Sequence, residues 1–319
     1  MRESKEKARS LHPFPLVAVL GPTAVGKTAL SIRLASELRA EIVNFDSVQV
    51  YRGLDIGSAK PTKKELARVP HHLIDILQPD EPFNAAAFSA KARAAIKSIT
   101  QRGRTVILTG GTNLYLRALL EGLAPCPGED HALRTRLKEI AKEFGTDVLH
   151  AFLSGIDTKS ASRIHPNDTL RIIRAIEVYI KTGKTLSLWH ERHQNEMVLS
   201  HCIKIGLMRP INELYERIDR RVDEMIKDGL IEEVRSLIKK GYSPDIKPLQ
   251  TLGYRHMIRF LAGASAFTET VVQLKRDHRH YARRQLIWLR NKPDIKWFNP
   301  DGLARLRRIW PHILGAKGN

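Results

Sequence analysis

Short apolar runs alternate with helix-like segments over the first third of the chain. The runs rich in Val, Ile and Leu predict buried strands at 16–20, 41–45, 72–77 and 105–108. The apolar residues of segments 28–38 and 84–100 recur every three to four positions, which predicts helices. Buried strands joined by helices are typical of a parallel sheet with helices on both faces. The sequence therefore predicts an α/β core.

The pattern changes after Gly122. Residues 124–128 (Ala-Pro-Cys-Pro-Gly) are typical of a linker, and from 130 to about 190 the apolar spacing is only helical. A strand is predicted again at 202–207, followed by helices at 211–227, 230–239 and 268–291. The predicted domains are a core with a helical C-terminal part, residues 1–122 and 201–319, and a helical insertion, residues 123–200.

One helix of the predicted insertion begins at Asn167 or Asp168, because both residue types are favoured N-caps. Its apolar residues fall on one stripe that we expect to face a core: Leu170, Ile173, Ile176 and Ile180. Arg171 and Arg174 fall elsewhere on its surface.

Length and composition narrow the class of protein. The chain has 319 residues, which suggests about two domains, and 42% of them are hydrophobic, as in ordinary globular proteins. No apolar run approaches the ~20 residues that span a bilayer, and the run 15–21 leads into a glycine-rich loop rather than a signal-peptide cleavage site. Cys126 and Cys202 lack the spacing of a zinc site or a disulfide framework. We therefore expect a cytoplasmic protein that does not bind membranes. A monomer is the expected state, although none of these features determines it.

Charge indicates the kind of partner. The chain has 53 Lys and Arg and 34 Asp and Glu, which gives a formal net charge of +19. A field of this strength favours polyanions, nucleic acid above all. A basic surface can also serve solubility alone, and charge by itself identifies no reaction.

The most specific motif directly follows the first predicted strand. Gly21-Pro22-Thr23-Ala24-Val25-Gly26-Lys27-Thr28 matches G-x-x-x-x-G-K-[ST], the phosphate-binding P-loop. Its glycines let successive backbone N–H groups face one concavity, and the N-terminus of the next helix adds positive potential. Lys27 supplies a charge, and the Thr28 hydroxyl can hold Mg²⁺ against a diphosphate. The motif alone favours a kinase or a nucleotide hydrolase, although a prenyl diphosphate offers similar groups.

Two further polar sequences end strands of the predicted sheet. Asp46-Ser47-Val48-Gln49 follows the second strand, and Thr109-Gly110-Gly111-Thr112 follows the fourth. We expect both beside the P-loop, because the carboxyl ends of parallel strands share one edge. Asp46 can there accept a proton or hold the water shell of a metal ion, and it can also be only a helix N-cap. Apart from Asp75, no apolar strand ends in the aspartate with which a nucleotide hydrolase holds Mg²⁺.

Longer motifs occur in a fixed order along the chain. They are GPTAVGKT (21–28), DSVQVYRGLDIGSAKPT (46–62), HHLID (71–75), TGGTNLYLRALLEG (109–122), HPND (165–168), RIIRAIEVY (171–179), QTLGY (250–254) and YARRQLIWLR (281–290). Together they resemble the bacterial tRNA dimethylallyltransferases, also called tRNA isopentenyltransferases. The likeness extends from about residue 16 to 298, and its motifs are long and unrelated to the generic P-loop.

The resemblance implies a reaction and roles for individual residues. The dimethylallyl group of dimethylallyl diphosphate passes to N6 of the adenosine 3′ of the anticodon, position 37 of tRNA, and diphosphate leaves. By this likeness the P-loop holds the diphosphate through Thr23 and Lys27, and Thr28 binds the cofactor Mg²⁺. Asp46 is the implied general base. Thr112 matches a position near the flipped base, and Arg221 matches an arginine near the leaving diphosphate.

The implied tRNA contacts are spread over the chain. They are Asp46, Ser47, Val48, Gln49, Thr112, Arg134, Leu170, Arg171, Arg174, Gln250, Gly253, Tyr254, Arg255, Arg283, Arg284, Gln285, Trp288 and Arg290. Basic and aromatic residues are interleaved in 275–296, a mixture that suits phosphate contacts and base stacking. One position departs from the family pattern, because Ile287 stands where a threonine is expected.

Three alternatives remain open. A small-molecule or nucleoside kinase would use ATP at the P-loop and would not need tRNA. An adenylate isopentenyltransferase would prenylate free nucleotides and would need neither the insertion nor the basic excess. An RNA-binding protein could keep the P-loop as a vestige, although Gly21, Gly26, Lys27, Thr28 and Asp46 are all intact.

Overall fold

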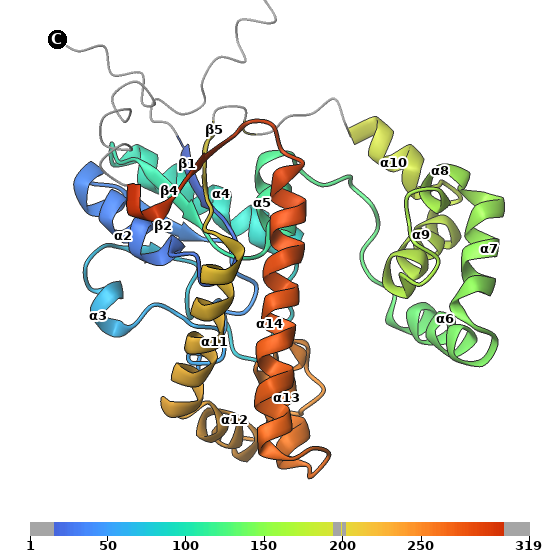
Figure 1. Cartoon of the computed structure of the whole chain (residues 1–319). Coiled ribbons are helices and arrows are strands. Elements are labelled where there is room, and N and C mark those ends of the chain that lie inside the picture. The colour runs from blue at the N-terminus through green and yellow to red at the C-terminus, as the bar shows by residue number, and fades with distance from the viewer. Residues whose placement is uncertain (1–15, 194–198, 200–201, 303–319) are drawn as a thin grey trace, which may run out of the picture. The chain divides into compact units, whose positions relative to one another are not determined.

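A computed structural model describes residues 16–193, 199 and 202–302 (Figure 1). The chain divides into two compact units. The first unit combines the segment that ends at Leu119 with the segment that begins at Leu199, and the second is Leu120–Val198. The second unit is therefore inserted, in sequence, into the first.

The first unit contains a six-stranded parallel sheet in the order β3-β2-β4-β1-β5-β6. Its strands are β1 (Leu16–Leu20), β2 (Glu41–Asn44), β3 (His71–His72), β4 (Val106–Thr109), β5 (Cys202–Leu207) and β6 (Ile295–Phe298). β1 lies between β4 and β5, with Leu16 paired to both Val106 and Cys202. All five residues of β1 are buried, which explains why this strand is a continuous apolar run. The predicted α/β fold with a parallel sheet is confirmed.

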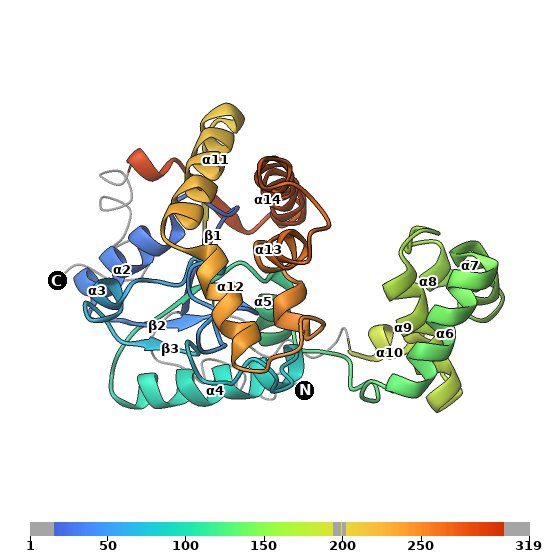
Figure 2. The same ribbon diagram turned by 90° about the horizontal axis from the view of Figure 1, so that it is seen from below.

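Helices cover both faces of the sheet, and α2 and α4 lie on opposite sides of it in Figure 2. The helices that accompany the sheet are α2 (Lys27–Leu38), α3 (Lys63–Leu66), α4 (Ala85–Gln101), α5 (Asn113–Leu120), α11 (Ile211–Lys227), α12 (Leu230–Lys239), α13 (Tyr254–Leu261) and α14 (Phe267–Arg290). Short 3₁₀ turns lie at Lys247–Gln250 and Pro300–Gly302. Val17 and Val19 of β1 belong to one apolar cluster with Leu30 of α2 and Leu214 and Ile218 of α11. This packing holds α2 and α11 on the same face of the sheet.

The described part of the second unit, up to His193, consists of helices without a strand. They are α6 (His131–Phe144), α7 (Thr146–Ile156), α8 (Thr158–Ala161), α9 (Thr169–Thr182) and α10 (Leu186–His193). Leu137, Leu153 and Ile173 belong to its core. Asp168 caps α9 by accepting a hydrogen bond from the backbone N–H of Arg171, as its residue type predicts. Nowhere in residues 16–193 and 202–302 is a helix both long and apolar enough to span a bilayer.

The strand predicted at 72–77 is wrong. Only His71–His72 form β3, and the backbone then turns, with φ of 63° at Leu73 and 54° at Asp75. Left-handed backbone of this kind cannot continue a strand. Lys60 holds the turn, because its Nζ lies 2.5 Å from Oδ1 of Asp75.

The apolar stripe predicted for α9 is only partly buried. Ile173 and Ile176 are buried, but Leu170 and Ile180 are 73% and 52% exposed. Both lie in the terminal turns of the helix, which spans Thr169–Thr182.

Candidate active site

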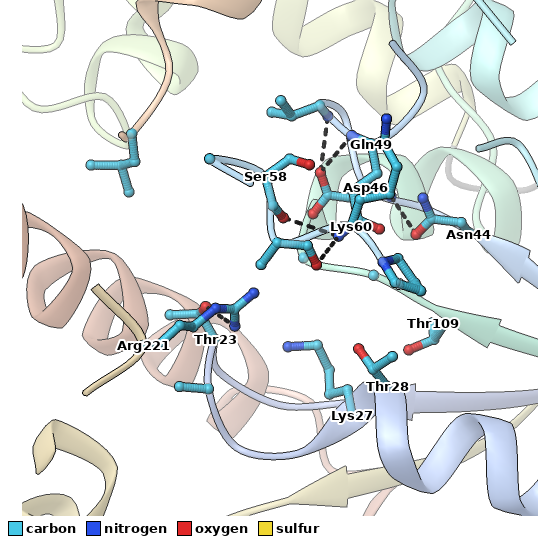
Figure 3. Close-up of a pocket in the computed structure, with 18 of the residues that line it drawn as sticks. Thr23, Lys27, Thr28, Asn44, Asp46, Gln49, Ser58, Lys60, Thr109 and Arg221 are labelled. Carbon is cyan, nitrogen blue, oxygen red and sulfur yellow. Dashed lines mark hydrogen bonds between the residues drawn. The ribbon is translucent and has the colours of Figure 1, made fainter. Parts of the chain in front are cut away.

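A cavity of about 790 Å³ adjoins the carboxyl ends of the central strands (Figure 3). Its walls include the P-loop, residues 46–49, residues 57–61, the turn 109–112, and the inner faces of α11 and α14. The sheet topology brings these segments together, because β1, β2 and β4 are neighbours or next neighbours that run in the same direction.

The P-loop takes the backbone that its sequence predicts. Gly21 and Gly26 have φ of 144° and 110°, values that side chains rarely allow. A Cβ on Gly21 would also lie 2.8 Å from the carbonyl oxygen of Leu207, so no larger residue fits there. Lys27 at the start of α2 donates through Nζ to the carbonyl oxygens of Gly21 and Pro22, at 3.0 and 2.8 Å. The lysine is therefore held close against the loop.

The charges around the P-loop are crowded and poorly hydrated. Burial in the cavity, with Arg221 close by, lowers the pKa of Lys27 to about 7, although Asp46 acts in the opposite direction. Burial likewise lowers the pKa of Arg221. Arg221 Nη1 donates to the Thr23 hydroxyl at 3.2 Å, and Arg217 Nε donates to the carbonyl oxygen of Ala24 at 2.9 Å. Arg221 and Arg217 thus add two cationic side chains to the P-loop, and this combination favours binding of a polyanion.

Asp46 lies across the cavity from Lys27 and Thr28, at the end of β2 (Figure 3). Its Oδ1 accepts the backbone N–H groups of Val48 at 2.9 Å and Gln49 at 3.4 Å, which fixes the carboxylate. A Cβ on Gly111 would lie 2.9 Å from the other oxygen, Oδ2, so a larger residue there would displace the carboxylate. The interpretation of Asp46 as a mere cap accounts for one oxygen only. Oδ2 remains available to a ligand in the cavity.

The segment 55–61 forms another wall, and Glu233 of α12 holds it. The carboxylate of Glu233 accepts the backbone N–H groups of Asp55, Ile56 and Gly57 at 2.8 to 3.1 Å. It also accepts the hydroxyl of Tyr254 at 2.7 Å. Gln49 is tied to the same segment, because its Nε2 donates to the carbonyl oxygens of Ser58 and Ala59 (Figure 3).

The structure brings many of the predicted site residues to this cavity. Those that line it are Thr23, Ala24, Gly26, Lys27, Thr28, Asp46, Ser47, Val48, Gln49, Thr112, Arg221, Gln250, Arg255, Arg284 and Gln285. The Thr112 hydroxyl accepts the backbone N–H of Ser47 at 2.9 Å, so the two strand ends are also linked to each other.

Other predicted residues of the first unit lie outside the cavity lining. They are Gly21, Val25, Gly253, Tyr254, Arg283, Trp288 and Arg290. Tyr254 is fully buried with its hydroxyl on Glu233, so its side chain has no surface to offer tRNA, contrary to the prediction. Arg283 and Arg290 are exposed on α14, and so is Ile287, which is 63% exposed.

The arginines predicted in the second unit are engaged in ion pairs. Arg134 and Arg174 both pair with Glu177, whose side chain is fully buried, and Arg171 pairs with Asp168. Burial would raise the pKa of Glu177, but hydrogen bonds from Arg134, the Asp130 N–H and Arg174 lower it to about 2. Arg134 and Arg174 therefore hold the core of this unit together, a role that the sequence did not indicate.

Sequence reasoning missed several residues of the cavity wall. Arg217 and Arg220 lie on α11 with Arg221, and their spacing of one helical turn was the available signal. His278 was also missed, and it lies on the inner face of α14 two helical turns before Gln285. Tyr281, which belongs to the stretch predicted to suit base stacking, lies one turn before Gln285 and lines the cavity as well. Burial lowers the pKa of His278 to about 4, so its ring is neutral at pH 7.

The cavity also offers oxygen ligands for a divalent cation. The Thr28 hydroxyl and the Asp46 carboxylate both line it, but no group of three or more His, Cys, Asp or Glu suited to a metal occurs within the described residues. Mg²⁺ is commonly bound by one or two protein oxygens, with phosphate oxygens and water completing its shell. The donor set fits Mg²⁺ held jointly with a diphosphate.

Comparisons with known sequences agree on one family. The model of the IPP transferase family matches residues 49–292. The tRNA dimethylallyltransferase 2 of Geotalea uraniireducens (strain Rf4) is 47% identical over 292 residues, which cover 91% of this chain and 94% of the relative. The tRNA dimethylallyltransferase of Syntrophobacter fumaroxidans (strain DSM 10017 / MPOB) is 48% identical over 310 residues, with coverage of 96% and 90%.

Solved structures give the same result. The tRNA isopentenylpyrophosphate transferase of Bacillus halodurans matches with a TM-score of 0.70 and 39% identity, covering 94% of this chain and 97% of that one. A eukaryotic dimethylallyltransferase acting on tRNA matches with a TM-score of 0.73 and 27% identity, covering 89% and 73%.

Proposed function

Because the chain belongs to the IPP transferase family, we propose that it transfers a dimethylallyl group to N6 of adenosine 37 in tRNA, 3′ of the anticodon. The donor is dimethylallyl diphosphate, and the products are N6-dimethylallyladenosine and diphosphate. One observation carries the proposal: Asp46 and the P-loop face each other across a single cavity. A leaving-group site and a proton acceptor are thus available to one pair of reactants.

Asp46 is proposed as the general base. The adenine amine is a poor nucleophile, because its lone pair is delocalised into the ring, and it needs an acceptor for its proton. The bond from N6 to the prenyl carbon forms as the carbon–oxygen bond of the donor breaks, and the N6 proton passes to Oδ2 of Asp46. The hydrogen bonds to Oδ1 hold the carboxylate in place without occupying that oxygen.

The P-loop and the arginines of α11 are proposed to hold the leaving diphosphate. Its charge grows as the carbon–oxygen bond breaks, and Lys27 and Arg221 are already held against the P-loop by hydrogen bonds. Donors that need no reorganisation stabilise such charge most effectively, each by about 3–4 kcal/mol. Arg217, which the sequence analysis did not include, adds a further cation at the loop.

Mg²⁺ is the proposed cofactor, held by the Thr28 hydroxyl together with the diphosphate. When bound, it neutralises phosphate charge and so favours departure of the leaving group. The walls formed by segment 57–61 and α14 help to keep water from the allylic carbon.

The proposed tRNA surface includes the basic outer face of α14 and the cavity rim at Gln250, Arg255 and Arg284. Adenosine 37 must leave its stack to enter the cavity, which costs a few kcal/mol and less in a single-stranded loop. The helical second unit is proposed to contact the anticodon stem, through residues of α9 such as Leu170 and Arg171 and through Arg134 of α6. The proposed location of the enzyme is the cytoplasm, and its proposed state is a monomer.

The kinase alternative has less support. β4 lies between β1 and β2 in the sheet. It ends in Thr109 rather than in the aspartate that a nucleotide hydrolase uses for Mg²⁺. Asp75 does not take that place, because it lies in the turn after β3 and pairs with Lys60.

A substrate-exchange assay tests the proposal. The protein and Mg²⁺ are incubated with labelled dimethylallyl diphosphate and either unmodified tRNA or AMP, and ATP replaces the donor in a control. We expect label in tRNA, and sequencing of the product should locate it at adenosine 37. Label that enters only AMP would indicate the adenylate enzyme, and consumption of ATP alone would indicate a kinase; either result rejects the proposal.

A further inference from the structure

Gln285 joins two parts of the active site through one buried side chain. It lies on the inner face of α14 and is 4% exposed. Its Oε1 accepts the backbone N–H of Thr23 in the P-loop at 2.8 Å, and its Nε2 donates to the carbonyl oxygen of Gly111 at 2.9 Å. Both ends of the amide are therefore used within the protein, and little of the side chain is left for RNA.

Tyr281 reinforces the same link from one helical turn away. Its hydroxyl also donates to the carbonyl oxygen of Gly111, at 3.0 Å. Burial raises the pKa of this hydroxyl well above its ordinary value, with Asp46 adding to the effect, so the phenol remains a donor at every pH that the enzyme meets. Gly111 is thus anchored twice to α14.

The two anchored segments are those that carry the proposed chemistry. Gly111 lies against Oδ2 of Asp46, since a Cβ there would come within 2.9 Å of that oxygen. Thr23 receives a hydrogen bond from Arg221 and belongs to the loop that holds Lys27. Gln285 therefore connects the side of the cavity that holds the leaving group to the side that holds the base.

We propose that Gln285, supported by Tyr281, is a positioning residue that sets the separation between the P-loop and Asp46. This inference rests on the proposed function and replaces the earlier prediction that Gln285 contacts tRNA. Transfer requires the prenyl carbon, fixed by its diphosphate, to lie in line with an adenine amine whose proton Asp46 can accept. A misplacement of 1 Å between such groups costs about 10²-fold in rate.

The test uses three variants. Gln285→Met keeps the length of the side chain and removes both hydrogen bonds, and Tyr281→Phe removes one bond to Gly111. Gln78→Met is the matched control, because it makes the same chemical change at an exposed residue outside the cavity lining. Four quantities are measured for each: the single-turnover rate of prenyl transfer with both substrates saturating, the Kd of inorganic pyrophosphate, the Kd of tRNA, and the melting temperature.

We expect the single-turnover rate to fall about 10²-fold in Gln285→Met and about 10-fold in Tyr281→Phe. Each substitution makes the separation between the P-loop and Asp46 less well defined. The two Kd values should change less than about threefold, since neither variant removes a charge from either binding surface. Gln78→Met should behave as the wild type. Tyr281→Phe loses a single hydroxyl, so it keeps the test valid if Gln285→Met melts early.

Two results would overturn the inference. In one, both variants transfer the prenyl group within threefold of the wild-type rate. In the other, Gln285→Met has a normal rate at saturation but a much weaker Kd for tRNA, which would make Gln285 an RNA contact. A wild-type protein that transfers no prenyl group to tRNA would instead reject the proposed function, so the two failures are distinguishable.

Discussion

At the scale of single residues, the two oxygens of Asp46 have different environments. Oδ1 accepts backbone N–H groups of the turn that follows β2, and among the described residues Oδ2 has no hydrogen-bond donor. The turn fixes the direction of the carboxylate, and the absence of a side chain on Gly111 leaves Oδ2 room. The structural role of this residue and its proposed chemical role can therefore be separated by substitution.

Asp46→Asn should separate them. The amide oxygen can still accept the Val48 N–H, but the amide cannot take a proton from the adenine. Loss of a general base typically costs 10²–10⁴-fold, so we expect a single-turnover rate about 10³-fold lower. The Kd of tRNA, measured by filter binding, should stay within about threefold, and Asp80→Asn at an exposed site should have no effect. Equal losses of rate and tRNA affinity would instead make Asp46 structural.

The lowered pKa of Lys27 predicts that the proposed binding of diphosphate depends on pH. With a pKa of about 7 in the free protein, its amine is mostly neutral at pH 8. A bound diphosphate favours the charged form and raises this pKa, so binding at pH 8 should take up roughly one proton through Lys27. At pH 6 the amine already carries its proton, and this uptake should vanish.

Calorimetry in buffers of different ionisation enthalpy measures this uptake with inorganic pyrophosphate. Lys27→Arg is the control, because arginine is charged at both pH values and takes up no proton. Subtracting the proton uptake of Lys27→Arg from that of the wild type removes the contribution from protonation of pyrophosphate itself. Equal uptake by wild type and variant at pH 8 would show that the lysine is already charged before binding.

At the scale of secondary-structure elements, the sequence predicts the bounds of an element best where its buried apolar residues are regularly spaced. The bounds of α11 and α12 agree with the prediction, because their apolar residues repeat at helical spacing over the whole length. β6 was missed, since only Ile295 of its four residues is buried and its pairing with β5 is set by tertiary structure. The turn after β3 could not be predicted either, because it depends on Lys60, which is distant in sequence.

The site follows the same division. The P-loop and Asp46 are local motifs at strand ends, and the sequence predicts that they meet. The hydrogen bond from the Thr23 N–H to Oε1 of Gln285 joins residues 262 positions apart, and no local sequence pattern predicts it. The same holds for Glu177, whose partners Arg134 and Arg174 looked like free cations in the sequence.

Glu177 should therefore stabilise the second unit. It is fully buried and accepts hydrogen bonds from both arginines and from the Asp130 N–H. Removing one member of a buried charge cluster costs about 3–5 kcal/mol, so Glu177→Gln should lower the free energy of unfolding of this unit by about 3 kcal/mol. Glu191→Gln breaks an exposed pair with Lys159 and should cost below about 1 kcal/mol. Urea unfolding measures both, and similar losses would contradict the prediction.

The same cluster predicts how the second unit responds to acid. The pKa of Glu177 is about 2 in the folded protein and higher when the chain unfolds. A lowered pKa contributes stability that is complete above the unfolded value and is lost as pH falls toward the folded one. The melting temperature of the wild type should therefore drop between about pH 4.5 and pH 2 more steeply than that of Glu177→Gln. Parallel curves would show that Glu177 is not ionised in the fold.

At the scale of the whole molecule, the positive charge is not shared between the two units. Residues 120–198 contain 11 Lys and Arg and 11 Asp and Glu, so the second unit has no net charge. The remainder of the chain has 42 Lys and Arg against 23 Asp and Glu and carries the entire +19. Three arginines of the second unit are moreover paired with Glu177 and Asp168. We therefore expect the electrostatic attraction of tRNA to come from the first unit.

This division predicts where the salt dependence of tRNA binding originates. Each phosphate contact contributes about 0.7–0.9 to the slope of log K against log salt. The double variant Arg283→Gln/Arg290→Gln, on the exposed face of α14, should thus reduce the slope by about 1.5. The matched variant Arg136→Gln/Lys142→Gln, on exposed positions of α6, removes the same charge from the second unit and should leave the slope nearly unchanged. Fluorescence titration of labelled tRNA from low to high salt measures both. An equal reduction in the two variants would mean that the second unit contacts RNA phosphates although it has no net charge. A wild-type slope near zero would show that charge is not the basis of tRNA binding at all.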